Sequence, residues 1–210
     1  MRKIKNFKIQ VYSYEVLRRA RKHKLDLAGI GLDDEAAMRE YASGLATALE
    51  PALVFEYLAP EDALAMRING DTPSPLTAGI LTLGAPFEAK VDAAADDTHK
   101  RLNRIAAQIF LNTAVGVTTG LALREAEPEG FELSPAIYIS SCPEQESQPQ
   151  EATSVPLYEN ELIKALCARL EADKIGVSFD TGAFSPKYSA VFALPWLSRK
   201  KKKSASASKK

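Results

Sequence analysis

Residues 175–196 read IGVSFDTGAFSPKYSAVFALPW and predict two β-strands joined by a loop. The segments 174–180 (KIGVSFD) and 185–196 (SPKYSAVFALPW) contain the β-branched and aromatic residues that favour strands. The residues between them are small and polar, and they outnumber the two that a tight hairpin needs. The loop is therefore either a plain connection or the rim of a functional site, and the residues alone leave both interpretations open.

Outward from this segment, predicted helices and strands alternate along the chain. A helix is expected at 33–49, because Met38, Leu45 and Leu49 recur at helical spacing. Two acids before them suit the N-terminus of a helix. Further helices are expected at 13–24, started by Ser13, at 86–123 with a break near 96–98, and at 157–171. Strands are expected at 3–11, 52–58, 64–68 and 77–84, a strand or an extended loop at 133–143, and a flexible excursion at 144–156.

Length and composition predict one soluble domain. The chain has 210 residues, of which 46% are hydrophobic, enough for a sizeable core over residues 1–198. No apolar run approaches the roughly 20 residues that span a bilayer, and no apolar segment follows the first charges, so we expect neither a membrane span nor a signal peptide. The two cysteines, Cys142 and Cys167, are expected to be reduced thiols in a cytoplasmic protein, although one bridge between them stays open.

Charge is strongly segregated although the formal net charge is zero. Residues 199–210 hold seven basic residues and no acid, and residues 1–24 hold nine basic residues beside Glu15. The stretch 25–198 is left with 11 basic and 26 acidic residues, which makes contact with nucleic acid unfavourable. The terminal run has the composition of a disordered solubilising tail, and its alternative is a contact with nucleic acid, anionic lipid or another copy.

The sequence lacks the motifs of common catalytic and metal sites. It contains no GxxxxGK[ST] loop, no GxGxxG after a strand, no HExxH and no GxSxG. His23 and His99 are the only histidines, which makes a metal site with several imidazoles or a Ser-His-acid triad hard to build. No metal is expected. Nothing beside Cys142 would lower the pKa of its thiol, and Cys167 fits a core position. No catalytic residue is assigned.

Two further patterns have a structural and a functional interpretation. The acid pairs at 33–34 and 96–97 stand at expected helix starts, where capping explains them better than carboxylate-pair catalysis does. The segment 110–123 (FLNTAVGVTTGLAL) carries Ala114, Gly116 and Gly120, whose small size would let another backbone approach closely. Tight helix packing explains this segment, and the alternative is that it helps to wall a ligand cleft.

The order of the segments resembles the activation, or reactivation, domain of cobalamin-dependent methionine synthase and the stand-alone proteins similar to it. The matching pieces include YEVLRRARKHK near the start, ILTLG before the long helix, SPAIY at 134–138 and DTGAFSPKY at 180–188. In the family the last two resemble RxSPGYxxxP and TESxMMxPRK. The resemblance covers residues 8–196 and consists of short motifs in the family's order.

This resemblance implies a single α+β domain with a twisted, mainly antiparallel sheet flanked by long helices and a cleft. In the family the cleft holds S-adenosylmethionine and presents it to cobalamin carried by a partner, while an external reductant supplies an electron. The partner implied is a corrinoid protein or a methionine synthase-like protein. The residues that would bind the cofactor come from the SPAIY segment and the DTGAFSPKY loop: Ser134, Pro135, Ala136, Tyr138, Thr181, Gly182 and Ser185.

The sequence departs from the family where ligand binding is concerned. The family's Arg, suited to a methionyl carboxylate, is replaced by Glu132 or Ser134 according to the alignment. The family's Gly is replaced by Ala136 or Tyr138. Three functions follow: an accessory protein of corrinoid metabolism, a non-catalytic partner-docking module on the same fold, and a nucleic-acid or membrane-surface protein that acts through its basic ends. Oligomeric state is left open.

Overall fold

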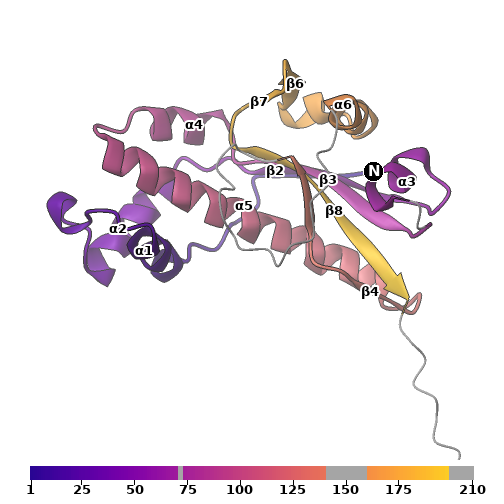
Figure 1. Cartoon of the computed structure of the whole chain (residues 1–210), viewed down its shortest axis with the longest axis horizontal. Helices are drawn as coiled ribbons and strands as arrows, with labels where there is room; N and C mark the ends of the chain where they lie inside the picture. Colours follow the sequence, from indigo (N-terminus) through magenta and orange to yellow (C-terminus); the bar gives the residue numbers. More distant parts are fainter. Residues whose placement is uncertain (71–72, 141–159, 199–210) are drawn as a thin grey trace, which may run out of the picture.

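The computed structural model describes residues 1–70, 73–140 and 160–198 (Figure 1). The expectations for the excursion at 144–156, for Cys142 and for the tail at 199–210 lie outside these residues. Within them the chain is a mixture of helices and antiparallel strands, so the expected α+β character is confirmed.

The described elements follow one another in this order. The helices are α1 (Ser13–Lys22), α2 (Glu35–Ala46), α3 (Ala63–Asn69), α4 (Ala85–Asp92), α5 (Asp97–Ala126) and α6 (Asn160–Arg169), with 3₁₀ turns η1 (Ala28–Ile30) and η2 (Ala172–Ile175). The strands are β1 (Arg2–Lys5), β2 (Ala52–Leu58), β3 (Leu76–Thr82), β4 (Phe131–Leu133), β5 (Ile137–Ser140), β6 (Ser178–Asp180), β7 (Ala183–Ser185) and β8 (Ser189–Ser198).

One antiparallel sheet organises the molecule. Its strands lie in the order β1-β2-β3-β8-β4, and β5 pairs with β8 beside β4. The strand β8, from the segment quoted first, pairs with β3 on one side and with both β4 and β5 on the other. A separate two-stranded hairpin, β6–β7, precedes it. The end of the chain therefore supplies the strand that joins the two halves of the sheet.

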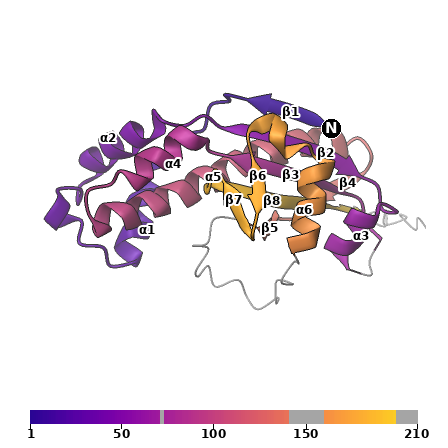
Figure 2. The same cartoon turned by 90° about the horizontal axis from the view of Figure 1, so that it is seen from above.

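Helices cover both faces of this sheet (Figures 1 and 2). Alternate residues of β2 point to opposite faces: Leu53 and Phe55 enter the core formed with α1, α2, α4 and α5. Their neighbours Ala52 and Val54 enter a second core formed with α3, α6, η2 and the hairpin. We name these the α5 face and the α6 face of the sheet. Because side chains alternate along a strand, a shift by one residue would exchange the two cores.

The α5 face is closed by large aromatic side chains. Phe192 of β8 lies over Gly79 of β3, its partner in register, and a Cβ at position 79 would approach the ring to 2.5 Å. Phe87 of α4 packs edge-on against Phe110 of α5 and against Tyr188, with ring centroids 5.9 and 5.5 Å apart. A glycine is therefore required in the centre of the sheet to make room for the Phe192 ring.

The expected break before α5 is confirmed. Asp96 is the N-cap of the helix, and its side chain accepts a hydrogen bond of 2.9 Å from the backbone N–H of His99. Asp34 caps α2 in the same way, accepting from Ala36 and Ala37 at 2.7 and 2.8 Å. Capping therefore accounts for one member of each acid pair.

Three predicted strands are corrected. The segment 174–180 forms a strand only from Ser178, because the 3₁₀ turn η2 ends at Ile175. The segment 64–68 belongs to helix α3, because Asp62 accepts from the backbone N–H of Leu64 as an N-cap and Ala65 and Ile68 are buried three residues apart. The strand expected at 3–11 ends at Lys5, and Asn6 follows with a φ of 53°. Helix α1 begins at Ser13 as expected, but no side-chain hydrogen bond caps it.

The helix α5 is long and apolar enough, by length and composition, to cross a membrane. Its most apolar window is 50% buried inside the structure, and the core helix of a soluble protein meets the same criterion. The expectation of no membrane span therefore stays a prediction. Gly116 and Gly120 are exposed on this helix, and a Cβ at either would meet nothing described within 4 Å, so the expected tight packing there is wrong for the described residues.

Candidate functional site

The segment 134–138 lies where the chain passes from β4 to β5 along β8. The backbone N–H of Ser134 donates to the carbonyl of Pro195 at 2.9 Å, which ties the segment to the end of β8. Pro135 is exposed, whereas Ala136 and Tyr138 pack against the core of the α5 face. Part of this segment is therefore accessible and part is anchored.

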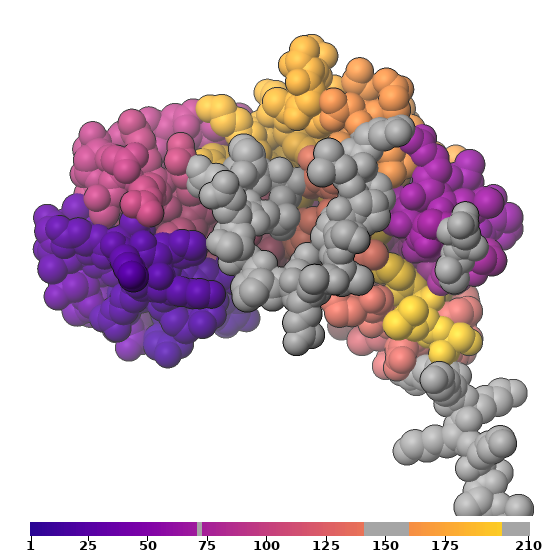
Figure 3. Space-filling model, viewed as in Figure 1, coloured from indigo at the N-terminus to yellow at the C-terminus, as the bar shows by residue number. Residues whose placement is uncertain are grey.

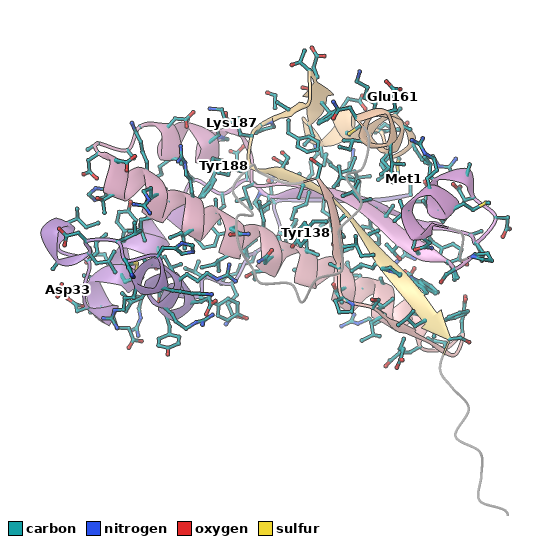
Figure 4. All side chains as sticks on the ribbon, viewed as in Figure 1. Met1, Asp33, Tyr138, Glu161, Lys187 and Tyr188 are labelled. Carbon is teal, nitrogen blue, oxygen red and sulfur yellow. The ribbon has the colours of Figure 1, made fainter. Side chains whose placement is uncertain are left out.

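Tyr138 makes a polar contact from β5 to helix α5, and Figure 4 labels its position. Its hydroxyl donates to Oδ1 of Asn112 on α5 at 2.6 Å. Burial raises the pKa of Tyr138 to about 12, and the positive charge of Arg19 on α1 acts in the opposite direction. The phenol is therefore a neutral hydrogen-bonding group at physiological pH, within electrostatic reach of a guanidinium.

Arg19 is in turn held by an acid of its own helix. Its Nε donates to Oε1 of Glu15 at 2.8 Å, and Arg18 donates to both oxygens of the same carboxylate at 2.7 and 2.8 Å. The hydrogen bond from Arg18, with a further one from Arg19, lowers the pKa of Glu15 to about 2. Two guanidinium groups therefore share one carboxylate, which leaves a net charge of +1 beside Tyr138. We name Glu15, Arg19, Asn112 and Tyr138 the Tyr138 cluster.

The loop of the opening segment is a tight two-residue hairpin, so the expectation of a longer loop is wrong. Thr181 and Gly182 are the two turn residues between β6 and β7, with φ angles of 50° and 87°. Two successive positive φ angles are typical of the type I′ turn that suits the twist of a hairpin. The backbone N–H of Thr181 donates to Oδ1 of Asp180 at 2.8 Å. The structure thus explains the polar and small residues of the loop by turn geometry.

The residues after the hairpin are fixed to helix α4. The backbone N–H of Lys187 donates to Glu88 at 2.9 Å, and its ammonium group lies 2.8 Å from Asp92 and 3.2 Å from Glu88. Figure 4 shows Lys187 and Tyr188 close together at this crossing. Ser185, the last of the expected site residues, is exposed at the end of β7.

The structure does not bring the expected site residues into one group. Ala136 and Tyr138 pack on the α5 face, whereas Phe184, between Gly182 and Ser185 in the chain, packs on the α6 face. The sheet therefore separates the two halves of the expected cofactor site. Their assignment to cofactor binding stays a prediction.

Sequence reasoning missed three members of the Tyr138 cluster. Glu15 was noted only as the single acid among the basic residues of 1–24. Arg19 stands in a run of basic residues that predicts a solvated face, and its partial burial depends on α1 packing on α5. Asn112 had a local signal, a polar residue in the apolar stretch IFLNTAV of 109–115. A partly buried amide in such a stretch favours a hydrogen-bonding partner, and the partner comes from β5.

Other chemical groups of the described residues have structural roles. Nδ1 of His99 lies 2.6 Å from Asp96 at the start of α5, and the His99 ring is tilted against Tyr41. Burial raises the pKa of the Cys167 thiol to about 11, which disfavours a reactive thiolate. Among the described residues, no three His, Cys, Asp or Glu side chains form a group that could hold a metal.

Comparison with known proteins gives no family for this chain. No family model matches it, and no curated protein matches it either. The function is therefore argued from the residues of the Tyr138 cluster and from the resemblance in the order of motifs.

Proposed function

We propose that this protein is a cytoplasmic accessory protein of corrinoid metabolism that binds S-adenosylmethionine and docks on a cobalamin-carrying partner. The observation that carries the proposal is the Tyr138 cluster, in which the phenol of β5 donates to an amide of α5 within electrostatic reach of a guanidinium of α1, next to the exposed Pro135. A fold like the methionine synthase activation domain is part of the proposal. The α+β architecture, with an antiparallel sheet and the long helix α5, supports it at a coarser level.

Arg19 supplies the charge that the family's motif lacks in this sequence. The family's Arg is replaced by Glu132 or Ser134, and neither can pair with a carboxylate as a guanidinium does. The Arg19 side chain is about 20% exposed, and Arg18 also engages its partner Glu15. A ligand carboxylate can therefore bind at Arg19 without leaving Glu15 unpaired.

Methyl transfer to the corrinoid would need a methyl donor, a corrinoid and a reductant, none of which is part of this chain. One electron from an external reductant would convert cob(II)alamin on the partner to cob(I)alamin, which would take a methyl cation from S-adenosylmethionine and release S-adenosylhomocysteine. The residues of this protein bind and orient the methyl donor, and none is proposed as a catalytic acid or base. Neutral Tyr138 suits this role, because it holds Asn112 without adding a negative charge that would compete with a ligand carboxylate for Arg19.

A second candidate function is a non-catalytic partner-docking module on the same fold. One observation favours it: Thr181, Gly182 and Ser185 are exposed on a hairpin that packs on the α6 face, away from the Tyr138 cluster. A protein that had lost the ligand would keep such a surface for its partner. Ligand binding distinguishes the two functions.

The test is a thermal-shift and calorimetric titration of the full chain with S-adenosylmethionine, S-adenosylhomocysteine and cob(II)alamin. Saturable stabilisation by the first two is expected, because a ligand that binds only the folded state raises its stability. Arg19→Gln should weaken binding roughly ten- to a hundredfold, the effect of losing a hydrogen bond to a charged group.

The matched control is Arg39→Gln. Arg39 pairs with Glu35 on the exposed side of α2, outside the Tyr138 cluster, so its loss should leave the affinity nearly unchanged. Equal losses in the two variants would contradict a direct contact of Arg19 with the ligand. A folded protein that responds to none of the three compounds would leave the docking module as its function.

A further inference from the structure

The two edges of the sheet differ in how easily a further strand can pair with them. One edge consists of β4 and β5 along β8, where Pro135 lacks an N–H and the register shifts between Tyr138 and Ser140. Both features hinder pairing with a further strand. The other edge is β1, which keeps an unbroken register with β2 over Arg2–Lys5 and contains no proline. The backbone of β1 is therefore the better suited to pair with a further strand.

Alternate residues of β1 direct their backbone groups away from the sheet. The N–H of Asn6, just after β1, donates to the carbonyl of Pro51, just before β2, at 2.8 Å. Inward and outward groups alternate along an antiparallel strand, so the N–H and C=O of Lys3 and Lys5 point outward. Within the described residues no strand pairs with this side of β1, and Figure 2 shows β1 at the rim of the sheet.

The side chains of β1 present positive charge on one face and an apolar group on the other. Lys3 and Lys5 pair in register with Val54 and Ala52, so their side chains lie on the α6 face, and both are exposed. Ile4 lies between them on the α5 face, partly buried against its core. A further strand beside β1 would therefore meet two lysines on one face and an isoleucine on the other.

The acids of the neighbouring strand and helix are engaged elsewhere. Glu56 of β2 pairs with Arg169 of α6 at 3.0 Å, and Glu125 of α5 pairs with Arg2. No ion pair between described residues includes either lysine of β1. These two lysines can therefore pair with acidic groups of another chain.

We propose that β1 binds an extended acidic segment of a partner protein as an additional antiparallel strand. Hydrogen bonds with the outward backbone groups of Lys3 and Lys5 supply affinity, and the side chains supply specificity. The segment carries acids opposite the two lysines and an apolar residue opposite Ile4. The same charges exclude a second copy of β1, because lysines would then lie opposite lysines. The inference goes beyond the proposed function, which assigns no surface to β1.

The backbone decides between this partner and a nucleic acid. A β-strand offers N–H and C=O groups that match the outward groups of Lys3 and Lys5, whereas phosphate groups offer only acceptors. The stretch 25–198, with 26 acidic and 11 basic residues, also repels an extended polyanion more than a short segment with two acids.

The β1 edge lies apart from the Tyr138 cluster. Tyr138 is on β5, and the strands β2, β3 and β8 separate β5 from β1. The N-terminus lies beside α3 in Figure 1, and Figure 3 shows α3, in purple, at the opposite end from α1 and α2, in indigo. A strand bound at β1 therefore leaves the Tyr138 cluster uncovered, and the two sites can be tested separately.

The probe is the peptide acetyl-Thr-Glu-Val-Glu-Thr-amide, added to the full chain without S-adenosylmethionine. Hydrogen exchange of single backbone amides, followed by nuclear magnetic resonance, measures its binding. The amides of Lys3 and Lys5 should exchange more slowly with the peptide bound, because they then donate to its carbonyls. The amide of Ile4 already donates to β2 and should change little. Binding should weaken as salt increases.

Variants of Lys3 separate the backbone from the charge. Lys3→Gln keeps the outward N–H and should weaken binding about two- to fivefold, the effect of one cross-strand charge pair. Lys3→Pro also removes the N–H, which an edge strand tolerates, and should weaken binding about three- to tenfold further. The control is Lys8→Gln, because Lys8 is exposed outside β1, and it should bind as the unaltered protein does. Circular dichroism would show that the variants are folded.

Methylated peptides test the backbone contact at constant charge. Methyl groups on the two glutamate nitrogens remove the donors that face β1 and should abolish binding. A methyl group on the valine nitrogen, which faces away from β1 in an antiparallel pair, should leave binding nearly unchanged.

Four outcomes would overturn the proposal. They are no binding of the peptide, no slower exchange at Lys3 and Lys5, equal binding of the two kinds of methylated peptide, and tighter binding of an oligonucleotide at the same residues. The third would assign the contact to charge alone, and the fourth would assign the edge to nucleic acid. None of the four depends on S-adenosylmethionine, so a failure here and a failure of the proposed function are distinguishable.

Discussion

Gly79 and Phe192 show how one residue limits the packing of the sheet. The Phe192 ring is fully buried between β8 and the helices of the α5 face, so it cannot swing into solvent when its space is taken. A Cβ at position 79 would lie 2.5 Å from its Cζ atom. The backbone conformation at position 79 allows an alanine, so only the Phe192 ring stands in the way of a Cβ.

Gly79→Ala is expected to lower the free energy of unfolding by about 1–3 kcal/mol, the usual cost of overpacking a core. Urea denaturation followed by circular dichroism measures this change. Gly116→Ala on the exposed side of α5 is the matched control, and it should raise stability by about 0.5–1 kcal/mol, since alanine is the better helix former. An unchanged free energy of unfolding for Gly79→Ala would contradict the close packing of Phe192 on Gly79.

Tyr138 makes stability depend on alkaline pH. Burial raises the pKa of its phenol from 10.0 to about 12, so between these values the unfolded chain loses the proton first and stability falls as pH rises. The contribution is complete below pH 10 and lost above pH 12, about 2–3 kcal/mol by linkage. Tyr138→Phe should be about 1 kcal/mol less stable at neutral pH, because Asn112 loses its donor, and should lose less stability in alkali.

Unfolding free energies of the two proteins at neutral and alkaline pH test this prediction. The variant Tyr14→Phe controls for tyrosine ionisation at the surface, since Tyr14 is 64% exposed and has no comparable burial. Parallel pH curves for Tyr138→Phe and the unaltered protein would show that Tyr138 is not desolvated.

At the scale of elements, side-chain caps determine where the helices begin. Asp34 accepts hydrogen bonds from two backbone N–H groups at the start of α2, and Asp62 and Asp96 do the same for α3 and α5 with one each. In each case the cap satisfies donors that have no partner inside the helix. The lack of a cap on α1 is consistent with a helix whose position depends on packing against α2 and α5.

Asp34→Ala should lower the free energy of unfolding by about 1 kcal/mol, the typical effect of losing an N-cap. Thermal and urea denaturation measure it. The control is Asp33→Ala, because Asp33 contributes its carbonyl to Arg21 and an alanine keeps that group. If both variants were equally destabilised, general charge at the helix start, and not the cap, would be responsible.

At the scale of the whole molecule, β8 joins parts of the chain that are distant in sequence. Trp196, the only tryptophan, is 3% exposed at the end of β8 and donates to Thr77 of β3 at 3.0 Å. Its ring also packs against Phe131 of β4, with centroids 5.8 Å apart. The helices α1 and α2 lie toward the opposite end of the molecule (Figure 1). Tryptophan fluorescence and helical circular dichroism therefore report on different regions.

A single domain over residues 1–198 predicts that these two signals change together. Urea unfolding followed by Trp196 fluorescence and by circular dichroism at helical wavelengths should give the same midpoint, as expected for a cooperative two-state transition. The helical signal comes largely from α1, α2 and α5, which share one core with β2, β3 and β8. Separate midpoints would indicate two units that unfold independently.

Local signals in the sequence predicted many of the elements. The run of apolar residues at 52–58 predicted a strand, and the capping side chain of Asp34 predicted the start of a helix. Both signals act within a few residues of the chain. The segment 64–68 was mispredicted because its apolar residues suit a strand and a helix alike, and the capping role of Asp62 decided for the helix. The mixture of helices and strands thus needed only local signals, whereas the α+β class with an antiparallel sheet was expected from the resemblance.

The meeting of Arg19, Asn112 and Tyr138 was decided by the tertiary structure alone. These residues stand far apart in the chain, and no local pattern tells which face of β5 turns toward α1 and α5. The tertiary structure also decided that Tyr138 and the β6–β7 hairpin lie on opposite faces of the sheet. Tyr138 packs on the α5 face, whereas Phe184 of the hairpin packs on the α6 face. Periodicity and capping are short-range properties and are written in the sequence, whereas the pairing of strands and the choice of face depend on burial of the whole core.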